Sequence, residues 1–307
     1  MRVAVCVLTY QRPEGLKRLI DGLNQLTFQK CEPPQVEIIV VDNDSSGSNY
    51  EWCQQISSTL KWTLKYYIEP QRGISYARNK AVNSAGDVDF IAFIDDDEVP
   101  EKCWLDELLY VQGLYNADVV SGPVIPYFTE NIPTWVIKGK FFERLRYPTG
   151  YSLNCAATNN VLIRTEIFIK FNTMFHERFA LTGGEDTHFF MRVYRAGYKI
   201  VQANDALVYE WIPKSRVNAK WILQRAYSTG SSFTSSELEL YPSISVLFMR
   251  IVRATRWIVQ GMVLIFPSLF KGRHVFIKAL QYVYRGVGML ACIAGKRYEE
   301  YRTTHQV

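Results

Sequence analysis

The sequence predicts an α/β protein built on a mostly parallel sheet, with a helical extension at its C-terminal end. Short apolar, β-branched segments alternate with segments of helical periodicity through the first two thirds of the chain, the pattern of parallel strands joined by helices. Residues 214–307 then carry 14 Lys and Arg against 4 Asp and Glu, whereas residues 1–213 carry a net charge of −5. This asymmetry indicates two functional surfaces. With 307 residues, 48% of them apolar, the chain can bury a sizeable core.

The elements of the first 124 residues follow from periodicity and from their start and stop residues. Continuous apolar runs predict strands, and apolar residues spaced by three and four predict helices. Pro13 lies in the first turn of one expected helix, and Gly86 follows the last turn of another. The first apolar run is too short for a signal peptide. We expect strands over residues 3–9, 36–41, 64–68, 89–94 and 117–124, and helices over residues 12–26, 50–60, 74–85 and 103–115.

The middle of the chain is less regular. Residues 125–155 are rich in aromatic residues and include several prolines, and we expect a loop or lid there. A strand over residues 158–164, a helix over residues 187–196 closed by Gly197, and a strand within residues 199–210 complete the α/β pattern.

The C-terminal region is apolar, with regularly spaced arginines. Arg250, Arg253 and Arg256 lie along one side of an expected helix, opposite apolar residues. The apolar run that follows is broken by Pro267 and is too short to span a bilayer, which takes about 20 residues. A basic amphipathic helix suits a membrane interface, so residues 244–290 predict peripheral membrane contact. The alternative is an ordinary core helix packed on the rest of the protein. A second apolar helix is expected over residues 275–290, packed beside the first.

Four consecutive carboxylates follow directly on the strand expected over residues 89–94. They are Asp95, Asp96, Asp97 and Glu98. Unpaired carboxylates repel each other, and a divalent cation such as Mg²⁺ or Mn²⁺, which prefers oxygen ligands, would relieve that repulsion. In an extended segment Asp95 and Asp97 point to the same side and can share one ligand, while Asp96 points elsewhere. The alternative interpretation is a solvated acidic turn.

Two further polar clusters, residues 9–12 and residues 42–44, also follow predicted strands. Ligands of parallel sheets bind beyond the carboxyl ends of the strands, so the three clusters together predict a nucleotide-sized polar site. Asp42 is placed to accept a hydrogen bond from a base or a ribose. Arg72 and Arg78 suit a phosphate group. A surface position for Arg72 and an ion pair within the protein for Arg78 are equally compatible with the sequence.

The pair Glu185-Asp186 follows Gly183-Gly184 at the start of an expected helix. Acidic residues at a helix N-terminus are favoured by its exposed N–H groups, which explains one carboxylate. Two glycines also let the backbone approach a ligand closely. A carboxylate at such a place can act as a general base that removes a proton from an acceptor hydroxyl. Both interpretations stay open on spacing alone.

Together these motifs resemble those of the family 2 glycosyltransferases of the GT-A fold, and within them the ExoM-like enzymes of bacterial exopolysaccharide and surface-glycan assembly. The resemblance covers about residues 1–215 and implies a catalytic domain there, with residues 216–307 as a C-terminal basic, amphipathic helical region. The GT-A fold is a Rossmann-like, nucleotide-binding, mixed but mostly parallel sheet flanked by helices. The matching segments, in the family's order, are residues 7–13, 39–45, 73–79, 93–98 and 184–186.

The resemblance also implies roles for individual residues. Asp97, with Asp95, would bind Mg²⁺ or Mn²⁺ bridging the diphosphate of a nucleotide-sugar donor. Asp186 would be the catalytic base of an inverting single displacement. Glu185 would shape the acceptor site and is the second choice for the base. The donor-binding residues would be Thr9, Tyr10, Arg12, Asp42, Asp44, Gly73, Arg78, Asp95 and Asp96.

Two departures from the family pattern bear on the site. Many relatives carry a His near the metal, on the strand after the Glu-Asp helix, and Glu210 stands at the comparable place here. Glu is a competent ligand for a hard cation, so Glu210 is expected as a third metal ligand. It could instead pair only with Lys214. Residues 224–227 do not match the QxxRW motif of processive members, so we expect the transfer of one sugar per encounter.

The resemblance further implies the partners and the location. We expect a UDP-sugar donor, because UDP is the commonest nucleotide, and a glycan or polyprenyl-linked sugar acceptor at the cytoplasmic face of the inner membrane. A nucleotidyltransferase would share the sheet and the acids, but residues 9–13 are not a Gly-rich, Lys-containing phosphate loop. The third alternative is an inactive scaffold that binds membrane or nucleic acid. The C-terminal basic residues alternate with apolar ones, so no nucleic-acid partner is expected.

Overall fold

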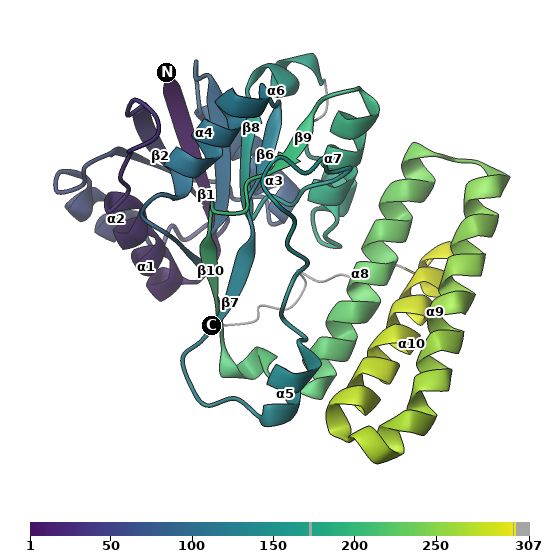
Figure 1. Ribbon diagram of the computed structural model, residues 1–307. Coiled ribbons are helices and arrows are strands. Elements are labelled where there is room, and N and C mark those ends of the chain that lie inside the picture. Colours follow the sequence, from purple (N-terminus) through teal and green to yellow (C-terminus); the bar gives the residue numbers. More distant parts are fainter. Residues whose placement is uncertain (172–173, 297, 299–307) are drawn as a thin grey trace.

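A seven-stranded sheet forms the centre of the computed structural model, which describes residues 1–171, 174–296 and 298. Its strands lie in the order β3-β2-β1-β4-β8-β6-β9 (Figure 1). Strand β8 runs antiparallel to β4 and β6, and the other pairs are parallel, so the predicted mixed, mostly parallel sheet is confirmed. The strands are β1 (Arg2–Thr9), β2 (Gln35–Asp42), β3 (Thr63–Ile68), β4 (Phe90–Asp95), β6 (Val119–Ser121), β8 (Asn160–Arg164) and β9 (Ile200–Gln202).

Helices cover both faces of this sheet, because successive residues of its central strands point to opposite sides. Val3, Val5 and Val7 of β1 belong to the core under α1, α2 and α4, whereas Ala4 and Cys6 belong to the core under α3, α6 and α7. Helix α6 was not predicted. The helices are α1 (Pro13–Asn24), α2 (Tyr50–Ser57), α3 (Ile74–Ser84), α4 (Trp104–Tyr115), α6 (Glu166–Lys170) and α7 (Glu185–Arg195).

The register of the central strands brings the three polar clusters to one edge of the sheet. Thr9 at the end of β1 is paired with Asp42 at the end of β2, and Leu8 is paired with Asp95 at the end of β4. The carboxyl ends of these three strands therefore lie side by side, as the sequence predicts.

A second, three-stranded sheet lies below the first and was not predicted (Figure 1). It consists of β5 (Glu98–Pro100), β10 (Val208–Ile212) and β7 (Val124–Phe128), in that order. The single strand expected over residues 117–124 is thus wrong. The chain leaves the large sheet after β6 and enters the small sheet at β7, because Gly122 and Pro123 interrupt the run, and Pro123 has no N–H for a ladder.

Two other segments also differ from expectation. Residues 199–210 contribute two strands, β9 and the first part of β10, which belong to different sheets. The expected loop over residues 125–155 begins with most of β7 and contains a short helix, α5 (Thr134–Gly139).

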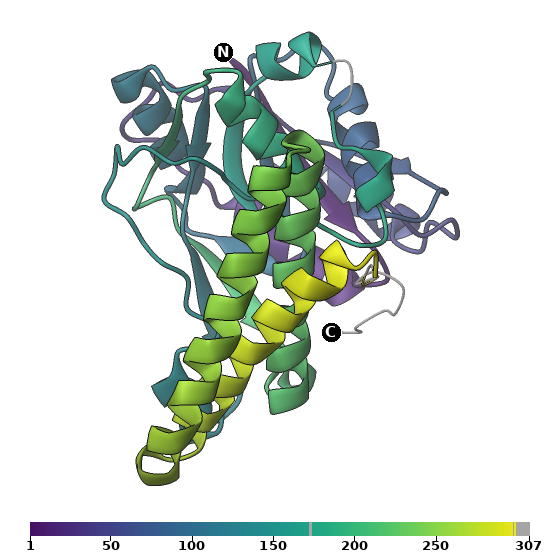
Figure 2. The same ribbon diagram turned by 90° about the vertical axis from the view of Figure 1, so that its right-hand side faces the viewer.

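Three long helices form the C-terminal region and stand beside the sheets (Figures 1 and 2). They are α8 (Ala219–Leu240), α9 (Ile244–Lys271) and α10 (Arg273–Ile293). Helix α8, which lies in the region expected to be helical but had no predicted bounds, packs against α7, and α10 packs against both α8 and α9. The side chains of Asn218 and Ser243 accept hydrogen bonds from backbone N–H groups and so cap the N-termini of α8 and α9. Within the described chain, no helix combines the length and the apolar character needed to cross a membrane.

Two features of α9 add to what the sequence indicates. The helix continues past Pro267 to Lys271, since a proline this near the end removes one of the last backbone hydrogen bonds without ending the helix. Arg250 and Arg253 lie on the same side of α9, where both reach Glu237 of α8, but Arg250 is not exposed. It is buried, forms an ion pair with Glu237 of α8, and its guanidinium lies 4.9 Å from the Phe233 ring.

Glycines set the distance between the C-terminal helices. A Cβ atom added at Gly288 of α10 would overlap the backbone carbonyl of Tyr227 in α8, and one added at Gly230 of α8 would overlap the carbonyl of Arg285 in α10. The two helices therefore touch through their backbones, and neither position has room for a side chain.

Replacing Gly288 with alanine is expected to lower the free energy of unfolding by about 1–3 kcal/mol, because overpacking forces α8 and α10 apart. Thermal and urea denaturation would measure it. The matched control is Gly113→Ala in α4, where an added Cβ meets open space, and where alanine should be neutral or add up to about 1 kcal/mol. Equal stability of the two variants would contradict the close packing.

Candidate active site

A cavity of about 470 Å³ opens where the ends of β1 and β4 meet the helices α3, α7 and α8. It is lined by most of the residues predicted for the site, together with a wall contributed by α8. The predicted residues that line it are Thr9, Tyr10, Arg12, Gly73, Arg78, Asp95, Asp96, Asp97, Glu185, Asp186 and Glu210. The α8 residues that line it are Trp221, Arg225, Ser228, Thr229, Ser232 and Phe233.

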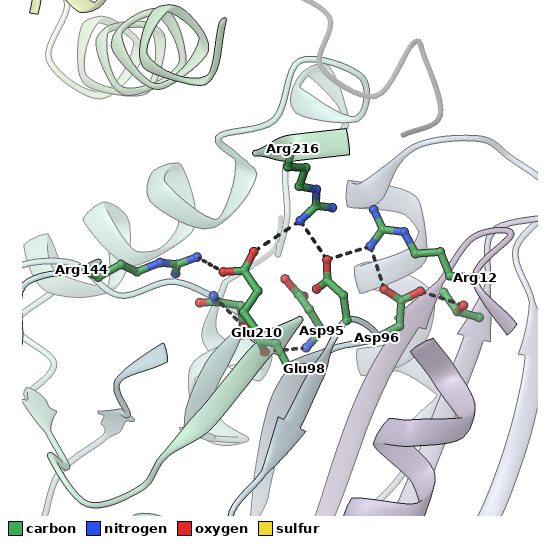
Figure 3. Close-up of polar contacts among 10 residues, drawn as sticks. Arg12, Asp95, Asp96, Glu98, Arg144, Glu210 and Arg216 are labelled. Atoms are coloured by element: carbon green, nitrogen blue, oxygen red, sulfur yellow. Dashed lines mark hydrogen bonds and ion pairs between the residues drawn. The ribbon is translucent and has the colours of Figure 1, made fainter. Parts of the chain in front are cut away.

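The run of acids folds as a turn between two sheets. Strand β4 ends at Asp95, strand β5 begins at Glu98, and the two residues between them form the turn. A turn does not keep the alternation of an extended segment, so the expectation that Asp96 points away from Asp97 is wrong. One nitrogen of Arg12 lies 3.0 Å from an oxygen of Asp96 and 3.2 Å from an oxygen of Asp97 (Figure 3).

A second group of charges faces this turn from β10. Glu210 accepts hydrogen bonds from Arg144 at 3.2 Å and from Arg216 at 3.4 Å, and the same nitrogen of Arg216 lies 3.1 Å from Asp97 (Figure 3). Lys214 pairs instead with Glu130 at 2.9 Å, so the alternative of a Lys214–Glu210 pair is not what the structure contains. Arg144 and Arg216 were missed, because only the fold brings them to the acids.

Burial makes three carboxyl groups at this junction hard to ionise. It raises the pKa of Asp95 to about 7, with Arg78 opposing the shift and Asp97 adding to it. Burial likewise raises the pKa of Asp96 to about 6 against the opposing charge of Arg12. It holds the pKa of Glu98 well above its usual range, and the neighbouring charge of Asp95 contributes to that shift.

The donor set fits a divalent cation. Five carboxyl groups, at positions 95–98 and 210, lie with three guanidinium groups, which leaves a formal excess of two negative charges. All the donors are hard oxygens, the type that Mg²⁺ and Mn²⁺ prefer. In the described part of the chain, no three acidic, His or Cys side chains are already grouped around one metal position. Asp97 and Glu210 nevertheless both reach one nitrogen of Arg216, so their oxygens converge on a cation.

The end of β1 supports the acidic turn and lines the cavity. The hydroxyl of Thr9 donates a hydrogen bond to Asp96 at 2.9 Å, in a buried position. The ring of Tyr10 lines the cavity, with the guanidinium of Arg72 5.3 Å from its centre. Thr9 therefore holds Asp96, while Tyr10 and Arg72 contribute a paired ring and guanidinium to the cavity wall.

Asp42 and Asp44 lie outside the set that lines the cavity. Asp42 is fully buried, and its oxygens accept hydrogen bonds from Asn49 at 3.0 Å and Tyr66 at 2.6 Å and from the backbone of Asp44. Asp44 accepts from Gln11 at 3.1 Å and from the backbone of the following turn. These carboxylates shape the loop after β2.

Asn43, between them, carries a role that sequence reasoning missed. Its amide donates to the carbonyls of Glu69 and Gln71 at 2.9 and 2.8 Å, and its oxygen accepts from the backbone of Gly73 at 2.8 Å. The asparagine thus fixes the segment that carries Arg72 and Gly73 into the cavity wall. In the sequence, the one sign of this role is that an asparagine side chain can both donate and accept hydrogen bonds.

The Glu-Asp pair at the start of α7 divides into a buried and an accessible carboxylate. Glu185 is 2% exposed and forms an ion pair with Arg78, which is also buried. Asp186 is partly exposed in the cavity, and its oxygen accepts from the backbone N–H of Thr187 at 2.6 Å. Arg78 is therefore an ion-pair partner within the protein, one of the two alternatives that the sequence left open.

The glycines before this pair are needed for the chain path. Gly183 and Gly184 have φ of +71° and +93°, in the left-handed region that favours glycine. A Cβ on Gly184 would lie 2.9 Å from the Cβ of Ser232. Gly184 consequently lets α8 approach the start of α7 and close the cavity.

Two family profiles match the chain. The one described as Glycosyl transferase family 2 matches residues 4–171, and the one described as Glycosyl transferase family group 2 matches residues 90–294. The Succinoglycan biosynthesis protein ExoM of Rhizobium meliloti (strain 1021) is 30% identical over 234 residues, which are 76% of this chain and 74% of that protein.

Solved structures share the fold at low sequence identity. The mannosyltransferase PcManGT of Pyrobaculum calidifontis, in complex with GDP-Man and Mn²⁺, has a TM-score of 0.64 at 15% identity and covers 96% of this chain and 88% of its own. Residues 1–349 of TarS from S. aureus, in complex with UDP-GlcNAc, give a TM-score of 0.54 at 14% identity, with 97% and 93% covered.

The raised pKa of Asp95 predicts a pH-dependent stability of the metal-free protein. An unfolded Asp titrates near 3.9, so the stability that its proton contributes is fully present below that pH and is lost as the pH rises through about 7. Asp95→Asn removes this titration. Because Asp95 is only partly covered, we expect the variant to gain about 1–2 kcal/mol at pH 8, or roughly 2–6 °C in Tm.

Thermal melts of wild type and Asp95→Asn in chelator, at pH 5 and pH 8, give the comparison. The gain at pH 5 should be less than half of the gain at pH 8. A difference in Tm that does not change with pH would contradict the shift.

Proposed function

The chain belongs to the family 2 glycosyltransferases of the GT-A fold, and from this premise we propose that it is an inverting enzyme that moves one sugar from a UDP-sugar to a hydroxyl group of a glycan or lipid-linked acceptor. One observation carries the proposal. A single cavity holds a carboxylate cluster suited to a divalent cation, arginines suited to a diphosphate, and the accessible carboxylate of Asp186.

Asp97 and Glu210, with Asp95, are the residues that would hold Mg²⁺ or Mn²⁺. When bound, such an ion neutralises the diphosphate of the donor and stabilises its departure as an anion. Arg12 and Thr9 hold the turn that carries Asp96 and Asp97. Tyr10 and Gly73 line the side of the cavity we assign to the nucleotide, with Asp42 and Asp44 supporting that wall from behind.

Asp186 is the proposed general base. Glu185 is neutralised by its buried ion pair with Arg78, which leaves Asp186 as the member of the pair that can reach an acceptor. The acceptor hydroxyl gives its proton to Asp186, and its oxygen forms a bond to the anomeric carbon. The bond from that carbon to the diphosphate oxygen breaks on the opposite side, and the electron pair leaves with the nucleoside diphosphate.

The acceptor is proposed to belong to surface-polysaccharide assembly, because the relative at 30% identity is named for succinoglycan biosynthesis. Helix α8 would contact it, since its side chains form the wall opposite the strand ends.

The outer side of α9 supports contact with a membrane. A stripe of exposed apolar side chains runs along it, mostly at spacings of three, four and seven residues. It comprises Ile244, Phe248, Val252, Val259, Met262, Val263, Phe266, Leu269 and Phe270, and we call it the apolar face of α9. Arg256, Lys271 and Arg273 are exposed beside it. We propose that this face rests on an anionic lipid surface, at the cytoplasmic side of the inner membrane, where a polyprenyl-linked acceptor would be found.

Asp186→Asn is expected to keep donor binding and to lower kcat by about 10²–10⁴, because the general base is lost while shape and hydrogen bonding are kept. Calorimetric binding and turnover across a panel of UDP-, dTDP- and GDP-sugars, with Mn²⁺, would measure both quantities and identify the donor. The control is Asp21→Asn, an exposed residue of α1 away from the cavity, which should behave as wild type. Full turnover by Asp186→Asn would show that another residue is the general base. If no nucleotide sugar of the panel binds, the inactive-scaffold alternative is favoured.

Replacing Leu269 and Phe270 together with glutamate should reduce flotation of the protein with phosphatidylcholine–phosphatidylglycerol vesicles to less than half, because it puts charge into the apolar face of α9. Wild type should float less with phosphatidylcholine alone and at high salt. The control is Leu114→Glu, an exposed leucine of α4 that is 59% accessible and lies on the sheet domain. Equal flotation of both variants would contradict the membrane contact.

A further inference from the structure

We propose that Arg216 is a built-in counter-cation that occupies the place between Asp97 and Glu210 in the free enzyme and exchanges it for the metal when the donor diphosphate arrives. The inference rests on the proposed donor site and adds to it a residue and a reason why metal and nucleotide bind together.

The geometry places one positive charge where two carboxylates meet. A single nitrogen of Arg216 lies 3.1 Å from Asp97 and 3.4 Å from Glu210, and the side chain is only 11% exposed. In Figure 3 the guanidinium of Arg216 points toward Glu210 on one side and toward the acidic turn on the other. A bound Mg²⁺ would stand about 2.1 Å from such oxygens. The ion and the guanidinium cannot hold the same two oxygens, and their like charges would repel at close range.

Two further arginines reach the same two acids. The other oxygen of Glu210 accepts from Arg144 at 3.2 Å, and the oxygen of Asp97 that meets Arg216 also meets Arg12 at 3.2 Å. Of these three arginines, Arg216 is the one that bridges the two proposed ligands. Its departure would remove one positive charge from both carboxylates at once.

The segment that carries Arg216 is suited to such a move. The residue ends a three-residue 3₁₀ turn, Lys214–Arg216, which joins β10 to α8. The turn is short, and Arg216 has the long, flexible side chain needed to leave the acids without unfolding a strand or a helix. Arg216 lines the same cavity as Arg78 and Tyr10, so a diphosphate bound in that cavity would lie near its guanidinium.

The exchange would couple the two ligands. Metal alone must displace Arg216 from its acids, and a diphosphate alone must draw Arg216 away and leave Asp97 and Glu210 facing each other. When both bind, the metal neutralises the acids and the guanidinium pairs with phosphate oxygens, for which its planar fork is suited. Each ligand then raises the affinity for the other by the same factor.

Titration of the full-length protein with Mn²⁺, followed by electron paramagnetic resonance of the free ion, tests the exchange without any turnover. In the absence of nucleotide, Arg216→Gln should bind Mn²⁺ about tenfold more tightly than wild type, because the competing charge is gone. With Mn²⁺ saturating, its affinity for UDP should fall about tenfold. The matched control is Lys214→Gln, which removes the same charge from the same turn but from an exposed pair with Glu130, and it should stay within about twofold of wild type.

A second variant covers the case in which Arg216→Gln does not fold. Arg216→Lys keeps the positive charge but not the fork, and its Mn²⁺ affinity should lie between those of wild type and the glutamine variant. Arg216→Gln that binds free Mn²⁺ no more tightly than wild type, or no more tightly than Lys214→Gln, overturns the exchange. Absence of Mn²⁺ binding in every variant, with and without UDP, overturns it together with the proposed metal site. Tighter Mn²⁺ binding in a protein that accepts no sugar donor would support the exchange and count against the proposed function.

Discussion

The crowding of carboxyl groups at the junction of the two sheets is the constraint on which the site depends. Strand β5 follows β4 after a two-residue turn, and β10 pairs antiparallel with β5 so that Glu210 stands directly opposite Glu98. Like charges opposed across strands are unfavourable. Three arginines from neighbouring elements form ion pairs with acids at this junction. They are Arg12 at the start of α1, Arg144 in the loop after α5 and Arg216 in the turn before α8. These three arginines offset the opposed negative charges and stabilise the junction of the two sheets.

The C-terminal helices belong to the site as well as to the scaffold. Helix α8 meets α7 at Gly184, where the missing side chain admits Ser232, and the hydroxyl of Ser236 donates to the carbonyl of Gly184 at 3.2 Å. Its neighbouring residues form the wall of the cavity opposite the strands. The start of α7, which carries Asp186, is therefore held between the large sheet and α8. A division of the chain at residue 215 separates the sequence motifs from a wall that they need.

Local sequence patterns predicted much of the fold and those parts of the site in which the residues are adjacent in sequence. Runs such as residues 36–41 and the acids after β4 are recognisable because strand, turn and charge are adjacent in sequence. Contacts made across long sequence separations were not recoverable in this way. In the sequence Arg216 looks like any surface arginine, and only the turn after β10 brings it to Asp97. The small sheet likewise joins three short segments that are far apart in the chain. Asp42 was recognised as special, but its partners Asn49 and Tyr66 gave no local sign that both would donate to one of its oxygens.

The backbone contact between α8 and α10 separates two kinds of evolutionary change. Gly230 faces α10 and has no room for variation, whereas Trp221, Thr229 and Phe233 of the same helix face the cavity. Substitutions on the cavity side can change the shape of the cavity without disturbing the helix that carries them. A lineage could therefore reshape the cavity by substitutions along one side of α8, while purifying selection preserves the other.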